Sequence, residues 1–398
     1  MGIENANKKI IFDSIVSHRE FTIPQIAGIS KLSVPTVTKC VSELHRANML
    51  EQIGEQEMKR KGRRATIYRI KPDYCYFLGV DVKAFELNLG IMNFAGDMLY
   101  TKHIDTFCFD NTKYNVDEIN SHIDEFIQEY QIEKSLISRA HFNIGGRVNS
   151  LAGTSASVFN FEDNQETPLA ISLARMIEIP VTIENDSKAM AYGELMCISN
   201  PSWKNILYVN AGWGLGLGII INGELYYGKD GYAGEFGHIY QYKNDVMCHC
   251  GKKGCIETEI SGRAIVRLLK EQIYGEHKQC ILSDKAWKRE AITTMDLVNA
   301  VKSGDLLCQE LFIETGRKLG AQLAGLINLF NPDCIIVGGY LAEVPEQYCI
   351  NPVKESINKY SFSLMNQHLP IITSRLGLLA GVTGGCLIAR NKMLQTLV

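Results

Sequence analysis

One histidine and three cysteines lie within 18 residues of one another in the second half of the chain: His238, Cys248, Cys250 and Cys255. Imidazole and thiolate groups are the usual ligands of structural zinc, and four of them complete a tetrahedral site. The last two cysteines are separated by Gly-Lys-Lys-Gly, which is typical of an exposed tight turn. Unpaired cysteines more often behave as small buried hydrophobes, and that interpretation suits the cysteines scattered elsewhere in the chain. The cluster instead predicts a structural Zn²⁺ ion.

Two alternatives remain for this cluster. His249 could replace His238 as the nitrogen ligand, although its position between two ligating cysteines leaves little room for the required geometry. The cysteines could also form a switch that senses zinc or an oxidant. The complete set of four ligands favours a permanent structural metal over a sensor.

Carboxylates beside the cluster could bind a polyhydroxylated ligand. Glu235 precedes the histidine of the cluster by three residues, and Glu257 follows its last cysteine by two. A second polar pair, Asn185 and Asp186, follows a predicted strand. A sugar pocket needs such convergent groups, because each buried hydroxyl left unpaired costs about 1–3 kcal/mol. The pair could equally cap a helix, and the two roles are compatible.

The length and composition limit the class of protein. At 398 residues the chain is too long for one compact core, so two or three domains are expected. Its hydrophobic content of 46% and charged content of 21% are those of a soluble globular protein. The sequence contains no run of about 18 apolar residues, so no membrane span is predicted. The first residues lack the basic start and apolar core of a secretion signal. Unpaired cysteines beside a thiolate metal motif favour a reducing cytoplasm.

Charge is distributed unevenly along the chain. Residues 1–71 contain 13 Lys and Arg against 7 Asp and Glu, a net charge of +6. The remaining residues contain 28 against 37, a net charge of −9. A basic N-terminal part on an acidic body predicts that only the first part meets a polyanion.

The basic part has the pattern of a winged helix-turn-helix. Apolar residues recur at helical spacing over residues 7–18, and a capping hydroxyl followed by proline starts further helices at Thr22 and Ser33. The basic run 59–64 before the strand-like segment 65–70 would form the wing. The predicted DNA contacts are Ser33, Thr36, Thr38, Lys39, Arg46, Lys61, Arg63 and Arg64. The alternative is a three-helix interaction domain with a solvated polar face, which the basic run makes less favoured.

The rest of the chain has the pattern of two similar α/β lobes with a cleft between them. Strands are predicted at residues 77–82, 87–94, 98–104, 140–144, 181–184, 206–211 and 218–221, with helices between several of them. The second set of strands repeats the theme of the first, with a glycine-rich turn after residue 211.

Three motifs together resemble the ROK family. They are the segment 183–194 (Ile-Glu-Asn-Asp-Ser-Lys-Ala-Met-Ala-Tyr-Gly-Glu), the segment 234–238 (Gly-Glu-Phe-Gly-His) and the cysteine cluster. The resemblance runs from about residue 77 to the C-terminus. The ROK family comprises sugar kinases and sugar-responsive repressors of the actin-like fold, and the N-terminal part resembles its repressor branch, which includes xylose and N-acetylglucosamine repressors.

This resemblance implies a domain organisation and a set of ligand contacts. Residues 1–71 would form the winged helix-turn-helix, 72–198 the first actin-like lobe, and 199–398 the second lobe with the zinc loop. A C-terminal helix from about residue 378 to 397 would return to the first lobe or offer an apolar face to a partner. The implied sugar contacts are Gly146, Arg147, Asn185, Asp186, Glu235, His238 and Glu257.

In the kinases of the family, the residue at the position of Asp186 is the base that deprotonates the sugar. Phosphoryl transfer depends mainly on positioning groups around the phosphates, and the first phosphate loop of the family reads Asp-x-Gly-Gly-Thr. Residues 81–85 instead read Asp-Val-Lys-Ala-Phe, without the glycines that let a backbone approach phosphate. Segments 211–218 and 337–339 retain glycines that also suit tight packing. The sequence therefore predicts that the protein is not an enzyme.

Taken together, the sequence predicts a sugar-responsive transcriptional regulator, most simply a repressor of carbohydrate-utilisation genes. A sugar or sugar phosphate between the lobes would release operator DNA, and two operator half-sites would require at least a homodimer, or a homotetramer. A sugar kinase with a DNA-binding extension and a zinc- or redox-sensing regulator are the alternatives.

Overall fold

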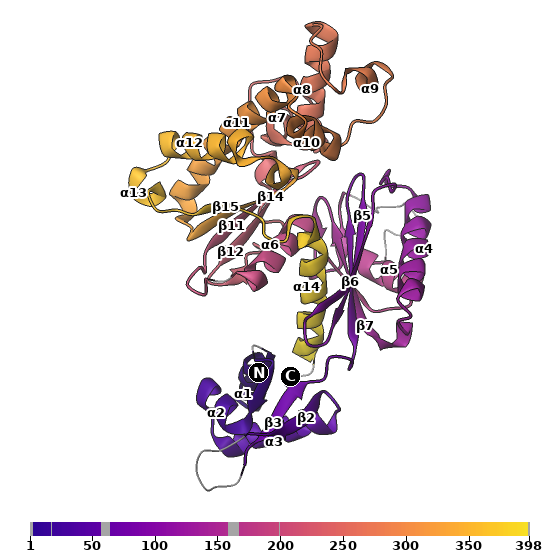
Figure 1. Cartoon of the computed structure of the whole chain (residues 1–398), viewed down its shortest axis with the longest axis vertical. Coiled ribbons are helices and arrows are strands. Elements are labelled where there is room, and N and C mark those ends of the chain that lie inside the picture. The colour runs from indigo at the N-terminus through magenta and orange to yellow at the C-terminus, as the bar shows by residue number, and fades with distance from the viewer. Residues whose placement is uncertain (1–2, 17, 57–63, 158–166, 199, 397–398) are drawn as a thin grey trace.

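The computed structural model describes residues 3–16, 18–56, 64–157, 167–198 and 200–396, and these form three units along the long axis of the molecule (Figure 1). A small N-terminal unit lies at one end, and two α/β lobes follow it. The predicted wing at residues 59–64, including Lys61 and Arg63, falls outside the described residues except for Arg64.

The N-terminal unit combines three helices with a three-stranded antiparallel sheet. Its elements are α1 (Ile3–Val16), β1 (Glu20–Thr22), α2 (Ile23–Ser30), α3 (Val34–Arg46), β2 (Leu50–Glu55) and β3 (Thr66–Ile70), with strand order β1-β3-β2. The predicted caps start α2 and α3. Thr22 and Gln25 form a capping box at α2, and the Ser33 side chain accepts a hydrogen bond from the Thr36 backbone N–H at α3.

The first lobe is built on a five-stranded sheet with strand order β10-β7-β4-β5-β6. Its strands are β4 (Tyr76–Val82), β5 (Leu87–Asn93), β6 (Met98–Ile104), β7 (Ile137–Ile144) and β10 (Val181–Asn185). Its helices are α4 (Lys113–Glu129), α5 (Leu169–Ile177) and α6 (Asp186–Cys197), and a small hairpin is formed by β8 (Val148–Asn149) and β9 (Thr154–Ser155). Burial on both faces explains the nearly continuous apolar character of the central strands.

The second lobe repeats this sheet. Its strands are β11 (Ile206–Ala211), β12 (Leu215–Ile221), β13 (Glu224–Leu225), β14 (Cys334–Gly339) and β15 (Ile371–Thr373), in the order β13-β12-β11-β14-β15. In each lobe three antiparallel strands are followed by two strands that extend the sheet in parallel. The helices of this lobe are α7 (Glu257–Ile260), α8 (Gly262–Gly275), α9 (Ser283–Trp287), α10 (Thr294–Lys302), α11 (Leu306–Phe330), α12 (Ile350–Tyr360) and α13 (Ser363–Asn366).

The glycine-rich segment after β11 is mostly a strand and not a turn, which corrects the sequence interpretation. Only residues 212–214 connect the strands, because β12 already begins at Leu215. Gly216 and Gly218 lie under α6, where an added Cβ would come within 2.0 Å of Ser187 Oγ and 2.4 Å of Ala191 Cβ respectively. These glycines are therefore required for close strand-to-helix packing.

The C-terminal helix α14 (Ala380–Thr396) leaves the second lobe and packs in the first, against α6 and strands β4, β5 and β7. Figure 1 shows it running from the junction of the lobes toward the N-terminal unit, with the two chain ends close together. Among the described helices, none is long and apolar enough to cross a membrane.

Candidate functional site

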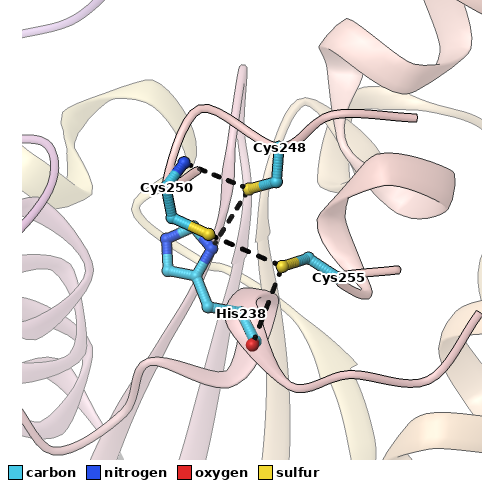
Figure 2. Close-up of side chains that lie close together, drawn as sticks. All are labelled: His238, Cys248, Cys250 and Cys255. Carbon is cyan, nitrogen blue, oxygen red and sulfur yellow. Dashed lines mark hydrogen bonds between the residues drawn. The ribbon is translucent and has the colours of Figure 1, made fainter. Parts of the chain in front are cut away.

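The four predicted zinc ligands meet in the segment of the second lobe between β13 and α7, and all are buried or partly buried (Figure 2). The ligand atoms of His238, Cys248, Cys250 and Cys255 all lie within 4.8 Å of one another. The Sγ atoms of Cys250 and Cys255 are 3.6 Å apart, and Nδ1 of His238 lies 3.5 Å from Cys248 Sγ. Zinc–sulfur bonds of about 2.3 Å place two thiolates of a tetrahedral site about 3.8 Å apart. The donor types and spacings therefore fit a Zn²⁺ ion with three sulfur ligands and one nitrogen ligand.

Tight turns bring these ligands together. Gly251 has a φ of +85°, and its N–H donates a hydrogen bond to the carbonyl of Cys248. Gly254 has a φ of +79°, and an added Cβ would come within 2.3 Å of the Tyr242 carbonyl oxygen. Both positions suit glycine because other residues rarely adopt this backbone conformation. The Gly-Lys-Lys-Gly segment thus folds the chain back so that three thiols face one point.

The alternative ligand His249 lies beside the cluster and contacts a carboxylate. Its Nδ1 lies 2.7 Å from Glu257 Oε1 and 3.9 Å from Cys248 Sγ. The thiol of Cys248 also donates to Glu257 Oε1 at 3.0 Å. Glu257, at the start of α7, lies beside the cluster as the sequence predicts, and it points toward the cluster through at least one oxygen.

The polar pair at the end of β10 lies at the edge of the first lobe. The Asn185 side chain caps α6 by accepting from the N–H groups of Ser187 and Lys188, and its Nδ2 donates to the carbonyl of Gly146 at 2.9 Å. Gly146 has a φ of +90°, and a Cβ there would come within 2.2 Å of Ser157 Oγ. The side-chain amide of Asn185 therefore has two roles: its oxygen caps α6, and its nitrogen binds the Gly146 carbonyl.

Asp186 is the first residue of α6 and is partly buried. Its Oδ1 accepts from the Ser187 N–H at 2.8 Å, and its Oδ2 accepts from Asn210 Nδ2 at 3.1 Å. Burial, with a further contribution from the charge of Asp81, raises its pKa to about 6. Because Asn210 belongs to β11, this carboxylate is held from both lobes.

A buried lysine lies beside Asp186 and was not identified from the sequence. Lys188 is 3% exposed, and its ammonium group donates to the carbonyl of Gly231. Burial lowers the pKa of Lys188, while the charges of Glu184, Glu235 and Asp186 partly oppose that shift. A lysine so placed offsets part of the negative charge of these carboxylates, and only the tertiary fold brings it there.

The remaining predicted sugar contacts lie at different depths. Glu235 and His238 face each other, with 3.7 Å between Glu235 Oε2 and His238 Nε2, and His238 Nδ1 lies 3.8 Å from Glu257 Oε1. The two nitrogens of His238 therefore face different neighbours: Nδ1 faces the cysteine cluster and Nε2 faces Glu235. Arg147 is exposed, and its backbone N–H donates to Ser157 Oγ.

The segment at the position of the first phosphate loop is filled by side chains. Asp81 is fully buried, and Lys83 Nζ lies 3.7 Å from its Oδ2 and makes a closer ion pair with Glu86. Phe85 packs edge to face on Trp213 of the second lobe, with ring centroids 4.8 Å apart. At the segment that the sequence predicts to lack a phosphate loop, the structure therefore places an ion-paired lysine and an aromatic ring that contacts the second lobe.

A cavity of about 160 Å³ lies beside the metal cluster. It is lined by Trp213, Gly214, Val246, Met247, Cys248, His249, Glu257, Thr258, Ser261, Arg263, Ala264 and Arg267. Among the predicted sugar contacts, Glu257 alone is in this lining. A larger open groove of about 650 Å³ continues along α8.

The exposed face of α3 carries most of the described DNA-contact candidates. Thr38, Lys39 and Arg46 are exposed, and the Thr38 hydroxyl donates back to the Val34 carbonyl at 2.8 Å. Ser33 is committed to the helix cap, with Thr36 Oγ1 at 2.8 Å from its hydroxyl. The cap residues therefore position α3, and Thr38, Lys39 and Arg46 lie on its exposed face.

Comparisons with known proteins agree with the architecture. The sequence model of the ROK family matches residues 77–392. The xylose repressor of Caldicellulosiruptor bescii is 25% identical over 394 residues, which cover 99% of this chain and 97% of the repressor.

Two solved structures have the same fold. A ROK family transcriptional regulator, described as a homologue of the Escherichia coli Mlc protein, superimposes with a TM-score of 0.80 and 25% identity, covering 99% of this chain and 98% of its own. A ROK family glucokinase from Streptomyces griseus, in complex with glucose and AMPPNP, gives a TM-score of 0.67 and 27% identity, covering 79% of this chain and 99% of its own. The regulator thus matches nearly the whole chain, whereas the kinase leaves about a fifth unmatched.

Proposed function

Because the chain belongs to the ROK family, whose actin-like fold it shares, we propose that it is a sugar-responsive transcriptional repressor of carbohydrate-utilisation genes. In its ground state it binds operator DNA, and a sugar bound between the lobes releases it. The full-length match to the Caldicellulosiruptor bescii xylose repressor and to the Mlc-like regulator supports this assignment.

The observation that carries the proposal is the contrast between the two halves of the site. In the polar half, Glu235 lies 3.7 Å from His238, and the charges of Glu235 and Asp186 both act on Lys188. The phosphate half is occupied by the Lys83 ion pairs and by the Phe85 ring. A protein that recognises a sugar without transferring phosphate requires only the first half.

We propose that the N-terminal unit is a winged helix-turn-helix with α3 as its recognition helix. Its helix and strand order, its net positive charge and the exposed Thr38, Lys39 and Arg46 support this role. The basic run with Lys61, Arg63 and Arg64 is the proposed wing. Operators of such proteins contain paired half-sites, so the active form is at least a homodimer.

Zn²⁺ is the proposed structural cofactor. His238, Cys248, Cys250 and Cys255 would hold it, and the ion would fix the imidazole of His238 with Nε2 toward Glu235. The chain supplies four ligands, so the site keeps no open position for chemistry. We therefore propose that the metal has a structural role, which is to hold the residues of the sugar site in place.

A direct test selects the operator from a random DNA pool and then measures its affinity with D-xylose, D-glucose and their phosphates, each with and without ATP. Release by a sugar, without sugar-dependent formation of ADP, is the expected result. ADP formation that disappears in Asp186→Asn would establish a kinase instead. Unchanged operator affinity with every compound would reject sugar-controlled repression.

A further inference from the structure

Helix α14 joins the region of the sugar site to the N-terminal unit. Its first residues lie beside Asp81 and α6, and its last turns lie beside the N-terminal unit (Figure 1). The helix leaves one lobe, crosses the other and ends at a third unit. Such a path makes it a candidate for communication between them.

In the first half of α14, glycines bring the helix backbone close to its neighbours. An added Cβ on Gly384 would come within 1.8 Å of the Ala189 carbonyl oxygen on α6, and one on Gly381 would come within 2.4 Å of the Asp81 carboxylate. From the other side, a Cβ on Gly193 of α6 would come within 2.9 Å of the Ala380 carbonyl oxygen. Close-packed backbones cannot absorb a shift by changing rotamers, so α14 must follow a movement of α6.

Helix α6 begins at the sugar site. Asp186 is its first residue and Asn185 is its cap, so a ligand held by these residues pulls directly on the helix terminus. Farther along, Tyr192 of α6 accepts a hydrogen bond from Asn391 Nδ2 of α14 at 3.0 Å. The two helices are thus joined near both ends of their contact.

The hydrophobic cluster that contains the core of the N-terminal unit also includes residues of the first lobe and of α14, whose Cys386 thiol lies against the Phe77 and Gly90 carbonyls of β4 and β5. Cys386 and Ala389 are fully buried in one hydrophobic cluster with Ile11, Ile15 and Ile70. Met393 and Leu394 pack against the same cluster. Arg390 Nε donates to the carbonyl of Phe94 at 2.8 Å and ties the helix to the end of β5.

We propose that α14 is the relay that carries the ligand state of the sugar site to the DNA-binding unit. This inference rests on the proposed repressor function. Sugar binding moves the N-terminus of α6, the glycine contacts pass the movement to α14, and the shared core reorients α1–α3 relative to the first lobe. Two copies reoriented in this way no longer match paired half-sites.

The test uses the full-length protein and three variants. Gly384→Ala places a methyl group between α14 and α6, and Asn391→Ala removes their exposed hydrogen bond while leaving the packing intact. Gly325→Ala is the matched control, because it lies within helix α11 where an added Cβ meets nothing within 4 Å. Asn391→Ala keeps the test valid should Gly384→Ala fail to fold.

The first measurement needs neither sugar nor DNA. Hydrogen exchange of the α1 and β3 amides is expected to change in Gly384→Ala and to remain unchanged in Gly325→Ala. If Gly384→Ala does not fold, the same change is expected in Asn391→Ala. A change confined to α6 and the start of α14 would overturn the relay, whatever the outcome of the sugar experiments.

The second measurement uses operator DNA with D-xylose and D-glucose as probes. In Asn391→Ala, sugar affinity measured by calorimetry is expected to stay at the wild-type value, while the sugar-induced change in operator affinity falls to within about twofold of none. A wild-type response in this variant would overturn the relay. Failure of the wild-type protein itself to respond would reject the proposed function, and the exchange measurement would still decide the relay.

Discussion

The rings of Phe85 and Trp213 meet at an interplanar angle of 84° and join the two lobes at equivalent positions. Phe85 follows β4 and Trp213 follows β11, which are the corresponding first strands of the two sheets. Trp213 is held in turn by α8, because its carbonyl accepts from the Arg263 N–H at 3.2 Å. The aromatic pair therefore connects the lobes at the segment that the sequence predicts to lack a phosphate loop.

Replacing Phe85 with alanine is expected to weaken the contact between the lobes. Edge-to-face pairs contribute about 0.5–1.5 kcal/mol beyond the apolar area that they bury. A double-mutant cycle of Phe85→Ala and Trp213→Ala, measured by thermal unfolding, should therefore give a coupling energy of about 1 kcal/mol. Additive losses of stability would show that the rings do not act together.

Removing the metal is expected to impair the sugar response at least as strongly as it impairs folding. Metal analysis of the purified protein should find about one zinc per chain, as four ligands require, and Cys250→Ser should lose it. The variant should keep its operator binding but lose release by sugar, because His238 is no longer fixed opposite Glu235. Cys108→Ser, at an exposed cysteine outside the cluster, is the control. A normal sugar response in zinc-free protein would contradict a supporting role for the metal.

Asp186→Asn is expected to change stability in a pH-dependent way. The pKa of Asp186 rises from 3.8 to about 6 on folding, first because of burial and second because of Asp81. The folded chain therefore holds this proton more tightly, and ionisation removes stability as the pH rises from about 4 to about 6. Asparagine carries no such charge, so the variant should be more stable than the wild type by about 1–3 kcal/mol at pH 8 and should lose this advantage near pH 4.

Thermal unfolding across this pH range measures the effect, with the exposed Asp230→Asn as control. A difference in stability that does not vary with pH would argue against the raised pKa of Asp186. The same variant should bind D-xylose or D-glucose less tightly, because Asp186 is a proposed acceptor for a sugar hydroxyl.

Lys39→Ala is expected to weaken operator binding at every sequence. Lys39 lies on the exposed face of α3, and a lysine that neutralises one phosphate contributes about one unit to the slope of log affinity against log salt. Filter binding between low and moderate salt should show that loss of slope. Lys278→Ala, at an exposed lysine in the second lobe, has the same charge change and should leave the slope unaltered.

The sequence was most informative where the site depends on local spacing. The cluster of His238 and the three cysteines is formed within one segment, so ligand types and two glycines were enough to predict that these side chains meet. The positions of Lys188 and Glu257 depend on contacts that the spacing does not encode. Lys188 donates a hydrogen bond to the carbonyl of Gly231, which lies 43 residues away along the chain. Glu257 contacts His249 only once the loop between them has folded.

Glycines were harder to interpret because one residue type serves opposite purposes. Gly251 and Gly254 indeed permit turns, whereas Gly216 and Gly218 lie in a strand and make room for α6. The periodicity of a short glycine-rich strand is too weak to distinguish these cases. The C-terminal helix was expected near residues 378–397 and spans Ala380–Thr396, but its destination depends on packing across the whole chain.

The hydrophobic cluster shared by the N-terminal unit, the first lobe and α14 determines how this protein can be recombined with its relatives. Ile70 lies on one side of the boundary at residues 71 and 72 and Phe77 on the other, and both pack in this cluster with Cys386. A chimera joined at that boundary would place foreign side chains in a single close-packed core. A functional exchange of operator specificity must therefore transplant the last turns of α14 together with the N-terminal unit, or be restricted to the exposed face of α3.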